Sequence, residues 1–81
     1  MEKAQNLAAI VRYHRKKGGL SQPALAKLAG VGKSAVFDLE KGKGTIQLDT
    51  LTKILGAINV TMKFESPLMS VYEREVTHEK G

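Results

Sequence analysis

Glycines interrupt the helical pattern of this chain at short intervals, and they limit how long each helix can be. Apolar residues recur with the 3.6-residue period of amphipathic helices, and glycine breaks that pattern shortly after residues 17, 29 and 41. Four helices are therefore expected, of which the second and third are only about eight residues long. Their expected ranges are 3–17, 22–29, 33–41 and 50–58.

Residues that commonly start or end helices support these boundaries. Ser21 is a good N-cap for the second helix, and Pro23 lies in its first turn, where a missing N–H does no harm. Asp49 is expected to cap the fourth helix, and Asn59 suits the left-handed position after it. The stripes expected to be buried are Leu7, Ile10, Val11 and the partly apolar His14 in the first helix, Leu25, Leu28 and Ala29 in the second, Ala35, Val36 and Leu39 in the third, and Leu51, Ile54, Leu55 and Ile58 in the fourth.

The period of the apolar pattern changes from 3.6 to 2 after residue 59. Val60, Met62 and Phe64 alternate with polar residues, which predicts a short β-strand over 60–66. A single strand cannot satisfy its own backbone, so it needs a second strand from the same chain or from an identical one. Pairing across a two-fold axis would make these three residues a dimer interface. Residues 71–76 are the alternative: a weak hairpin partner, or part of an unstructured tail.

The composition excludes several classes of protein. A chain of 81 residues forms one small domain at most, and without cysteine it has neither disulfides nor thiolate metal sites. His14 and His78 are too far apart in sequence to suggest a metal pair, and no cofactor is expected. No apolar run approaches the roughly 18 residues that span a membrane, and the first residues lack a signal-peptide layout. A soluble, cytoplasmic protein is expected.

The positive charge is concentrated in the first part of the chain. The net charge is +5; residues 1–50 hold nine Lys or Arg against four Asp or Glu, whereas residues 51–81 hold four of each kind. This asymmetry is typical of a domain that meets a polyanion with one face. For the basic run at 15–17 alone, a role at the C-terminal end of a helix dipole is an equally good explanation.

The second and third predicted helices form a candidate helix-turn-helix unit. They are joined by three residues around glycine, and the second helix of such a unit enters the DNA major groove. At 100° per residue, Lys33, Ser34, Phe37 and Lys41 share one side of the third helix. The two residues at its N-terminus can reach base edges, and Lys41 can reach phosphate.

Phe37 and Lys43 add to this face. A large ring beside lysines costs apolar exposure unless something covers it, and a thymine methyl group is one candidate. Packing against a neighbouring loop or helix is the other. Lys43, in the loop after the third helix, would release counterions on binding together with Lys33 and Lys41, so binding is expected to fall steeply with salt.

The stretch from 15 to 55, RKKGGLSQPALAKLAGVGKSAVFDLEKGKGTIQLDTLTKIL, resembles the lambda-repressor-like, Cro/cI (Xre) helix-turn-helix family. The shared elements are the R-x-x-x-G-L-S-Q lead-in, the L-A-x-x-A-G-V pair across the turn, the x-x-[LIF]-E-x-G-K end of the third helix and the L-x-T-L-x-K-I-L of the fourth. The resemblance implies a mainly α, four- to five-helix DNA-binding domain, here with a short C-terminal β-strand that pairs in a dimer. It is similar above all to HipB-type antitoxins, which repress their own operon as dimers and bind a kinase-like toxin.

The resemblance also implies roles for single residues. Gln22 would contact phosphate and brace the recognition helix, Lys33, Ser34 and Phe37 match base-reading positions, and Lys41 matches a phosphate contact. Arg15 and Glu40 match a structural pair that ties the first helix to the third. Physical reasoning agrees, because an unneutralised Glu40 near the reading face would repel DNA. Phe37 and Gly32 depart from the usual residues at their positions, so the target sequence cannot be inferred from the family.

The organisation predicted from these patterns has three parts: a DNA-binding domain over 1–59, a dimerisation strand over 60–66, and a tail over 67–81. The leading function is a dimeric, sequence-specific repressor that binds a palindromic operator and has no enzymatic activity. A stand-alone Xre-type regulator without a toxin partner is the first alternative, and a protein-binding helical module is the second. A third comes from KLAGVGKS at 27–34, which resembles a phosphate-binding loop but lacks its first glycine and the strand that must precede it.

Overall fold

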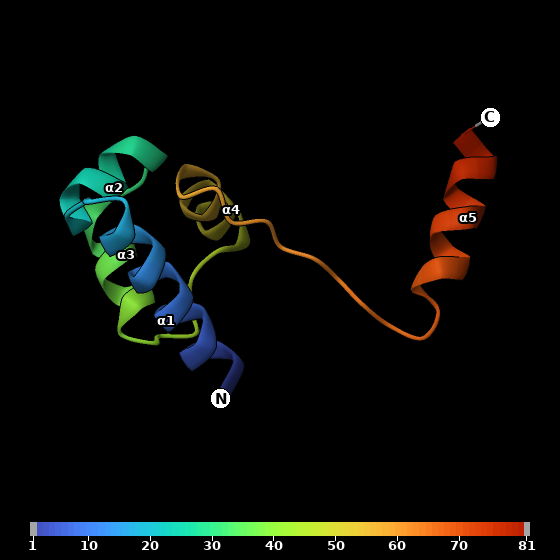
Figure 1. The fold of residues 1–81 in the computed structure, drawn as a ribbon, viewed down its shortest axis with the longest axis horizontal. Helices are drawn as coiled ribbons and strands as arrows, with labels where there is room; N and C mark the ends of the chain where they lie inside the picture. The colour runs from blue at the N-terminus through green and yellow to red at the C-terminus, as the bar shows by residue number, and fades with distance from the viewer. Residues whose placement is uncertain (1, 81) are drawn as a thin grey trace.

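The computed structural model describes residues 2–80 of the chain, and its side chains from residue 7 to residue 77. The described residues form five helices and no strand (Figure 1). The helices are α1 (Glu2–Lys17), α2 (Gln22–Ala29), α3 (Lys33–Glu40), α4 (Leu48–Ala57) and α5 (Met69–Lys80). The first four make a small bundle, and α5 stands apart from it at the end of an extended connection.

The ends of α2 show how local chemistry sets the short helices. The Ser21 side chain accepts a hydrogen bond of 3.1 Å from the N–H of Ala24, which makes Ser21 the N-cap, as predicted. Gly30 ends the helix with φ +73°, a left-handed conformation that glycine adopts at little cost. The next N–H, from Val31, returns to the carbonyl of Ala26 at 3.0 Å. The chain therefore turns sharply, and only three residues lie between α2 and α3.

The prediction for the start of α4 was wrong by two positions. The N-cap is Gln47 rather than Asp49, and no side chain closes a capping bond there. Asp49 instead lies in the first turn, where its negative charge interacts favourably with the helix dipole, and Lys53 one turn later lies 3.4 Å from its carboxylate. Asn59, after the helix, has φ +59°, the left-handed conformation predicted for it.

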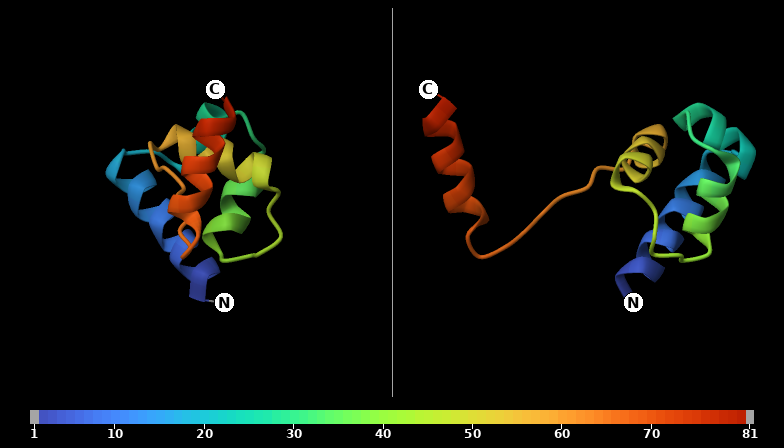
Figure 2. Two further views of the ribbon diagram at one scale, coloured as in Figure 1. Left: turned by 90° about the vertical axis from the view of Figure 1, so that its right-hand side faces the viewer. Right: turned by 180° about the vertical axis from the view of Figure 1, so that it is seen from behind.

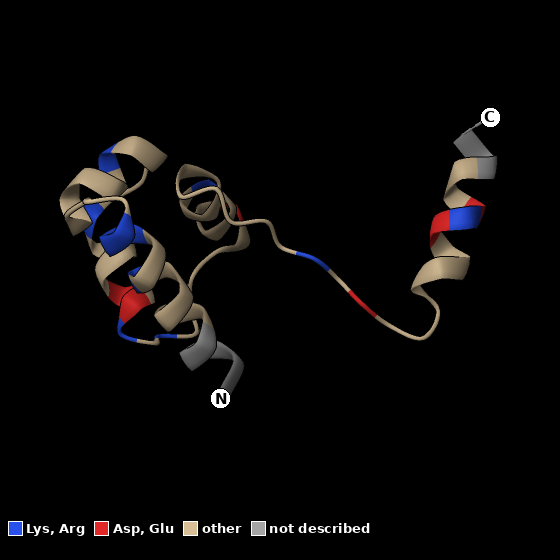
Figure 3. Cartoon of the chain, viewed as in Figure 1, with Lys and Arg blue, Asp and Glu red and all other residues tan. Residues whose placement is uncertain are grey.

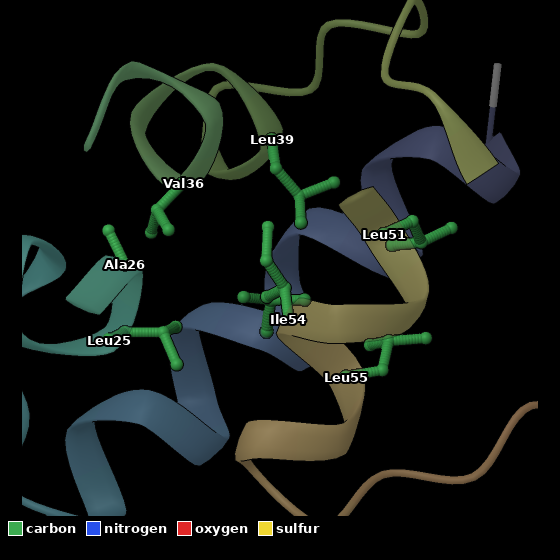
Figure 4. Close-up of a cluster of buried hydrophobic side chains, with 8 residues drawn as sticks. Leu25, Ala26, Val36, Leu39, Leu51, Ile54 and Leu55 are labelled. Atoms are coloured by element: carbon green, nitrogen blue, oxygen red, sulfur yellow. The ribbon is translucent and has the colours of Figure 1, made fainter. Parts of the chain in front are cut away.

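The core lies where α1 to α4 meet (Figure 4). It is built from side chains that all four helices contribute: Val11, Leu25, Ala26, Val36, Leu39, Leu51, Ile54 and Leu55. α2 packs against α3 and α4, and α1 packs against α3. Removing an aliphatic side chain of this size from water stabilises the fold by about 1.5–3 kcal/mol.

Two of the predicted buried stripes differ from those observed. Ile10 and His14 of α1 are exposed, because the buried side of that helix runs instead through Ala8, Val11 and Arg15. Leu28 of α2 is also exposed, at 62%. By its spacing each of these residues lies next to the buried side of its helix, but the packing of the described bundle leaves it exposed.

The predicted strand over 60–66 is absent from the described chain. Val60 packs against the core, and its N–H donates to the carbonyl of Leu55 at 2.9 Å, which closes the end of α4. Beyond it the backbone is extended as far as 66, and the described chain offers it no ladder partner. The hairpin or unstructured tail predicted around 71–76 is wrong, because that stretch is part of α5. A strand needs a partner backbone, and a helix cannot supply one.

α5 is separated from the bundle in Figure 1 and in the right-hand view of Figure 2, and it overlaps the bundle only in projection in the left-hand view of Figure 2. It is not among the helix pairs that pack closely, which are α1 with α3 and α2 with α3 and α4. None of the described helices is long and apolar enough to cross a membrane. The described residues therefore form a packed four-helix bundle and a fifth helix that does not pack closely against it.

Two leucines on α2 provide a matched test of this core. Leu25 is fully buried and Leu28 is 62% exposed, so the same substitution should have different costs at the two positions. Leu25→Ala is expected to lower the free energy of unfolding by about 2–5 kcal/mol, because it leaves a cavity. Leu28→Ala should change it by less than about 0.5 kcal/mol. Urea unfolding followed by circular dichroism measures both, and equal losses would contradict the observed packing.

Candidate nucleic-acid interface

One side of α3 is exposed and carries four of the residues selected from the sequence. Lys33, Ser34, Phe37 and Lys41 are all exposed, whereas Val36, Leu39 and Glu40 are buried against the bundle. At 100° per residue the four exposed positions fall within an arc of about 100°. We call these four residues the reading face. Gly32, the N-cap before it, has no side chain to cap the first turn, so no side chain satisfies the N–H groups there.

Phe37 lies at the centre of the reading face. Its side chain is 47% exposed, and the Lys41 ammonium nitrogen lies 4.9 Å from the centre of its ring. This is a cation–π contact, in which the electron-rich face of the ring attracts the positive charge. Apolar surface therefore remains open next to a positive charge, an arrangement suited to a base edge beside a phosphate.

Lys43 lies in the loop that follows α3. Its ammonium nitrogen is 3.6 Å from a carboxylate oxygen of Asp38, and both side chains are well exposed. Exposed ion pairs of this kind contribute about 0–1 kcal/mol to stability. The pair therefore places Lys43 near the C-terminal end of α3, and its charge can still interact with other groups.

Behind the reading face, a buried carboxylate joins three helices. Arg15 of α1 donates two hydrogen bonds to the Glu40 carboxylate of α3, from Nε at 2.6 Å and from a terminal nitrogen at 2.9 Å. Gln22, the first residue of α2, donates a third at 3.0 Å. Glu40 is 3% exposed and Arg15 is 8% exposed. The bidentate geometry is the strongest form of the Arg–carboxylate interaction.

Two further bonds complete this cluster. The remaining guanidinium nitrogen of Arg15 donates to the carbonyl of Leu20 at 2.8 Å, in the turn between α1 and α2. Arg12 donates to the backbone carbonyl of Glu40 at 2.8 Å, which satisfies one of the carbonyls that the end of α3 leaves without a helical partner. Among the described residues, no buried side-chain nitrogen or oxygen lacks a hydrogen-bond partner.

The cluster keeps Glu40 ionised. Burial by itself would raise the pKa of the Glu40 carboxyl, but the hydrogen bonds from Arg15 and Gln22, with the charges of Arg15 and Arg12, outweigh it and hold the pKa below its ordinary value. For Arg15, the hydrogen bond to Glu40 raises the pKa, although burial opposes the effect. The negative charge beside the reading face is therefore present and neutralised within the protein.

Sequence reasoning did not identify Arg12 as part of this cluster. The available signal was its spacing: Arg12 precedes Arg15 by three residues, so the two side chains are neighbours on one helix face. It also did not identify the Lys43–Asp38 pair. For Gln22 it predicted bracing of the recognition helix, and the structure brings Gln22 into contact with Glu40.

The described lysines and arginines lie mostly on α1 to α3 and on the loop after α3 (Figure 3). The Nδ1 of His14 donates to the carbonyl of Ile10 at 2.7 Å. Among the described residues, His14 is not part of a group of potential metal ligands. The side chain of His78 falls outside the described residues. Within the described part of the chain, no group of three or more His, Cys, Asp or Glu side chains comes together.

The segment KLAGVGKS does not form a phosphate-binding loop. Residues 27–29 end α2, residues 30–32 make the turn, and Lys33 and Ser34 open α3. A phosphate-binding loop follows a strand, and here a helix precedes the glycines. The glycine, lysine and serine instead form the turn and the first residues of the exposed helix.

Comparison with known proteins agrees with this fold and site. A family model described as helix-turn-helix matches residues 11–64, and the chain belongs to this Xre/Cro-like helix-turn-helix family. The family is one of DNA-binding transcription regulators. The matched range contains α2, α3, α4 and the whole reading face.

Two similar proteins illustrate the relationship. The chain is 36% identical over 62 residues to the uncharacterised HTH-type transcriptional regulator y4mF of Sinorhizobium fredii (strain NBRC 101917 / NGR234), covering 76% of this chain and 82% of that protein. Among solved structures it is similar to one titled MDT Protein, with a TM-score of 0.70 and 25% identity over 79% of this chain and 90% of that one.

The Glu40 cluster predicts a specific dependence of stability on pH. A depressed pKa in the folded state means that Glu40 stabilises the fold above its ordinary pKa of about 4.5 and that this contribution is lost as the pH falls through the lower, folded-state pKa. Glu40→Gln is expected to lower the free energy of unfolding at pH 7 by about 3–5 kcal/mol, because Arg15 is left buried without a counter-charge.

The measurement is urea unfolding of the wild type and Glu40→Gln between pH 7 and pH 3. The difference between them should be constant down to about pH 5 and then shrink. Lys53→Gln is the control, because Lys53 belongs to an exposed pair with Asp49 and its loss should matter little. A wild-type–variant difference that stays unchanged down to pH 3 would show that Glu40 is not held ionised by the cluster.

Proposed function

We propose that the protein is a sequence-specific transcriptional repressor that inserts α3 into the major groove of operator DNA. The observation that carries this proposal is the reading face, which is exposed on a helix anchored from behind by the Arg15–Glu40 pair. A rigid helix with a basic, partly apolar outer side is what direct base readout requires. No catalytic activity is part of the proposal.

Each residue of the site has a distinct proposed role. Lys33 and Ser34 contact base edges at the N-terminal end of α3, and Phe37 contacts a thymine methyl group. Three residues around this centre contact phosphates and set the register of the protein on the duplex: Gln22, Lys41 and Lys43. Gly32 allows the backbone before Lys33 to approach the DNA closely, because it carries no side chain.

The repressor acts as a homodimer on a palindromic operator. Two recognition helices related by a two-fold axis would read half-sites roughly 34 Å apart, or about one turn of DNA. In the described chain, residues 61–65 of the extended segment have no ladder partner, and Met62 and Phe64 are 39% and 70% exposed. Antiparallel pairing with a second copy would form the strand that one chain alone lacks and would cover Val60, Met62 and Phe64.

A narrower proposal is that the protein is a HipB-like antitoxin that binds a kinase-like toxin and represses a shared operon. Its support is the resemblance of residues 15–55 and a C-terminal region that does not pack on its own bundle. The alternative is a stand-alone Xre-type regulator. A kinase-like gene immediately downstream, whose product co-purifies with this chain, supports the antitoxin, whereas an isolated gene supports the stand-alone regulator.

Two lysines of the reading face test the division between base and phosphate contacts. Gel-shift titration against the DNA upstream of the gene should show a specific complex that weakens steeply with salt. Lys33→Ala should reduce the preference for the operator over unrelated DNA, because it removes a base contact. Lys41→Ala should weaken all sequences about equally and reduce the salt slope by about one unit.

The outcomes are distinguishable. Absence of any specific complex at moderate salt would contradict the repressor proposal as a whole. A specific complex in which both variants act alike would leave the repressor in place but show that the roles of the two lysines are wrongly assigned. Thr52→Ala, on the exposed side of α4, is a matched surface control.

Phe37 can be tested by removing the methyl group that it is proposed to contact. Replacing single thymines of the operator by uracil deletes only that methyl, which is worth about 0.8 kcal/mol of burial, or roughly fourfold in affinity. One thymine per half-site should show this loss with the wild type and none with Phe37→Ala. Losses that are the same for both proteins would exclude the methyl contact without affecting the repressor proposal.

A further inference from the structure

The C-terminal part of the chain exposes several large apolar side chains. Phe64 and Leu68 are each 70% exposed, and Tyr72 is 60% exposed. All three lie on the extended arm (residues 60–68) or on α5, away from the bundle (Figures 1 and 2). Phe64 and Tyr72 line the same hollow, and exposed apolar side chains gathered in this way are typical of an interaction site.

The pattern along α5 defines what its partner must look like. Met69, Tyr72 and Val76 follow the i, i+3, i+7 spacing and form one apolar stripe. At 100° per residue, Glu73 lies at one edge of the stripe and Glu75 lies close to the other, whereas Arg74 points away. The stripe is therefore bordered by carboxylates, and the complementary surface is an apolar stripe bordered by cations.

The outer side of α1 has this form. Ala9, Ile10 and Tyr13 are exposed on one side of the helix, and Lys16 and Lys17 continue it toward the C-terminal end. The ammonium nitrogen of Lys17 lies 5.6 Å from the centre of the Tyr13 ring. This side of the helix has a shallow hollow of about 480 Å³, which is lined by Ala9, Arg12, Tyr13, Lys16 and Lys17. We call this surface the α1 groove.

We propose that α5 of one copy of this chain packs in the α1 groove of a second copy, and that the exchange is reciprocal. The two surfaces match in length, since nine residues of α1 and eight of α5 each cover about 11–12 Å of helix. They match in charge, because Glu73 and Glu75 meet Arg12, Lys16 and Lys17. A two-fold axis forms the contact twice, so each α5 finds the same groove on its partner.

The arm explains why the partner is another copy. It leaves α4 after Val60 and carries α5 away from the bundle to which it belongs, so the helix is presented outward. DNA is a less suitable occupant of the α1 groove, because a phosphate backbone would neutralise the lysines but leave Ala9, Ile10 and Tyr13 uncovered. The exchange does not rest on DNA binding, and its test contains no DNA.

Cysteine cross-linking tests this proposal cleanly, because the chain has no cysteine of its own. One full-length variant carries Ala9→Cys in the α1 groove, and a second, differently tagged variant carries Met69→Cys or Val76→Cys on α5. The two are mixed and oxidised, so a disulfide between the tags can form only between copies. The Val76→Cys arm reports antiparallel docking and the Met69→Cys arm parallel docking. Thr52→Cys, exposed on α4, replaces Ala9→Cys as the control for random collision.

A cross-linked heterodimer with Ala9→Cys, in clear excess over the Thr52→Cys control, is the expected result. Cross-links no stronger than the control, or formed mainly between two α5 cysteines, would overturn the proposal. A single chain that carries both Ala9→Cys and Val76→Cys gives a further test. If this chain forms an internal disulfide in dilute solution while the mixed variants stay unlinked, α5 occupies the α1 groove of its own chain and the proposal is overturned.

A charge exchange gives a second, independent readout. Glu73→Lys should weaken the dimer in sedimentation equilibrium roughly two- to thirtyfold, the range expected for two exposed ion pairs, because the two-fold axis forms the contact twice. Adding Lys16→Glu to the same chain should restore the affinity, because the pair is re-formed with opposite signs. Failure of the double variant to recover would show that Glu73 and Lys16 do not face each other across the interface.

Discussion

The orientation of α3 depends on the interaction between Arg15 and Glu40. A carboxylate near the end of an eight-residue helix would normally lie in water, and beside a DNA-reading surface it would repel phosphate. Here it is buried and receives two hydrogen bonds from Arg15 and one from Gln22. A short helix gains little from its own backbone bonds, so its direction has to come from such tertiary contacts. The charge that would repel phosphate if it were exposed thereby holds α3 in place.

The cluster also couples the two ends of the helix-turn-helix unit. Gln22 begins α2 and Glu40 ends α3, and their side chains meet 3.0 Å apart although 18 residues separate them. Gly30, in a left-handed conformation, makes this closure possible, because it reverses the chain within three residues. Any DNA contact made by Gln22 is consequently transmitted to α3 through Glu40. If Gln22 contacts phosphate as proposed, DNA affinity and the orientation of α3 would both depend on this one buried carboxylate.

Local features of the fold could be predicted from the sequence, whereas features that depend on a partner could not. The Ser21 cap, the Gly30 turn and the left-handed Asn59 each follow from the chemistry of one residue in one backbone conformation. The side of α3 that is exposed follows from its period. By contrast, the alternation over 60–66 predicts a strand only if a second backbone is present, and the contact of Lys41 with Phe37 depends on rotamers that no pattern encodes. The spacing of Met69, Tyr72 and Val76 is that of a helix, but the neighbouring Val71 and Thr77 favour a strand, and the prediction for 71–76 did not include a helix.

Only four of the five described helices contribute to the core. A chain of 81 residues with so small a core is expected to have a low free energy of unfolding. The apolar side chains of the arm and α5 are therefore surface that contributes nothing until a second molecule covers it. Dimerisation through these elements would add burial to a marginal fold and would hold two reading faces at a constant separation. A dimer that contacts both half-sites of a palindrome binds far more tightly than a single copy on one half-site. The same C-terminal segment would therefore contribute to folding, to assembly and to DNA recognition. The exposure of this segment in the described chain is the physical reason for the proposal that the functional unit contains two copies.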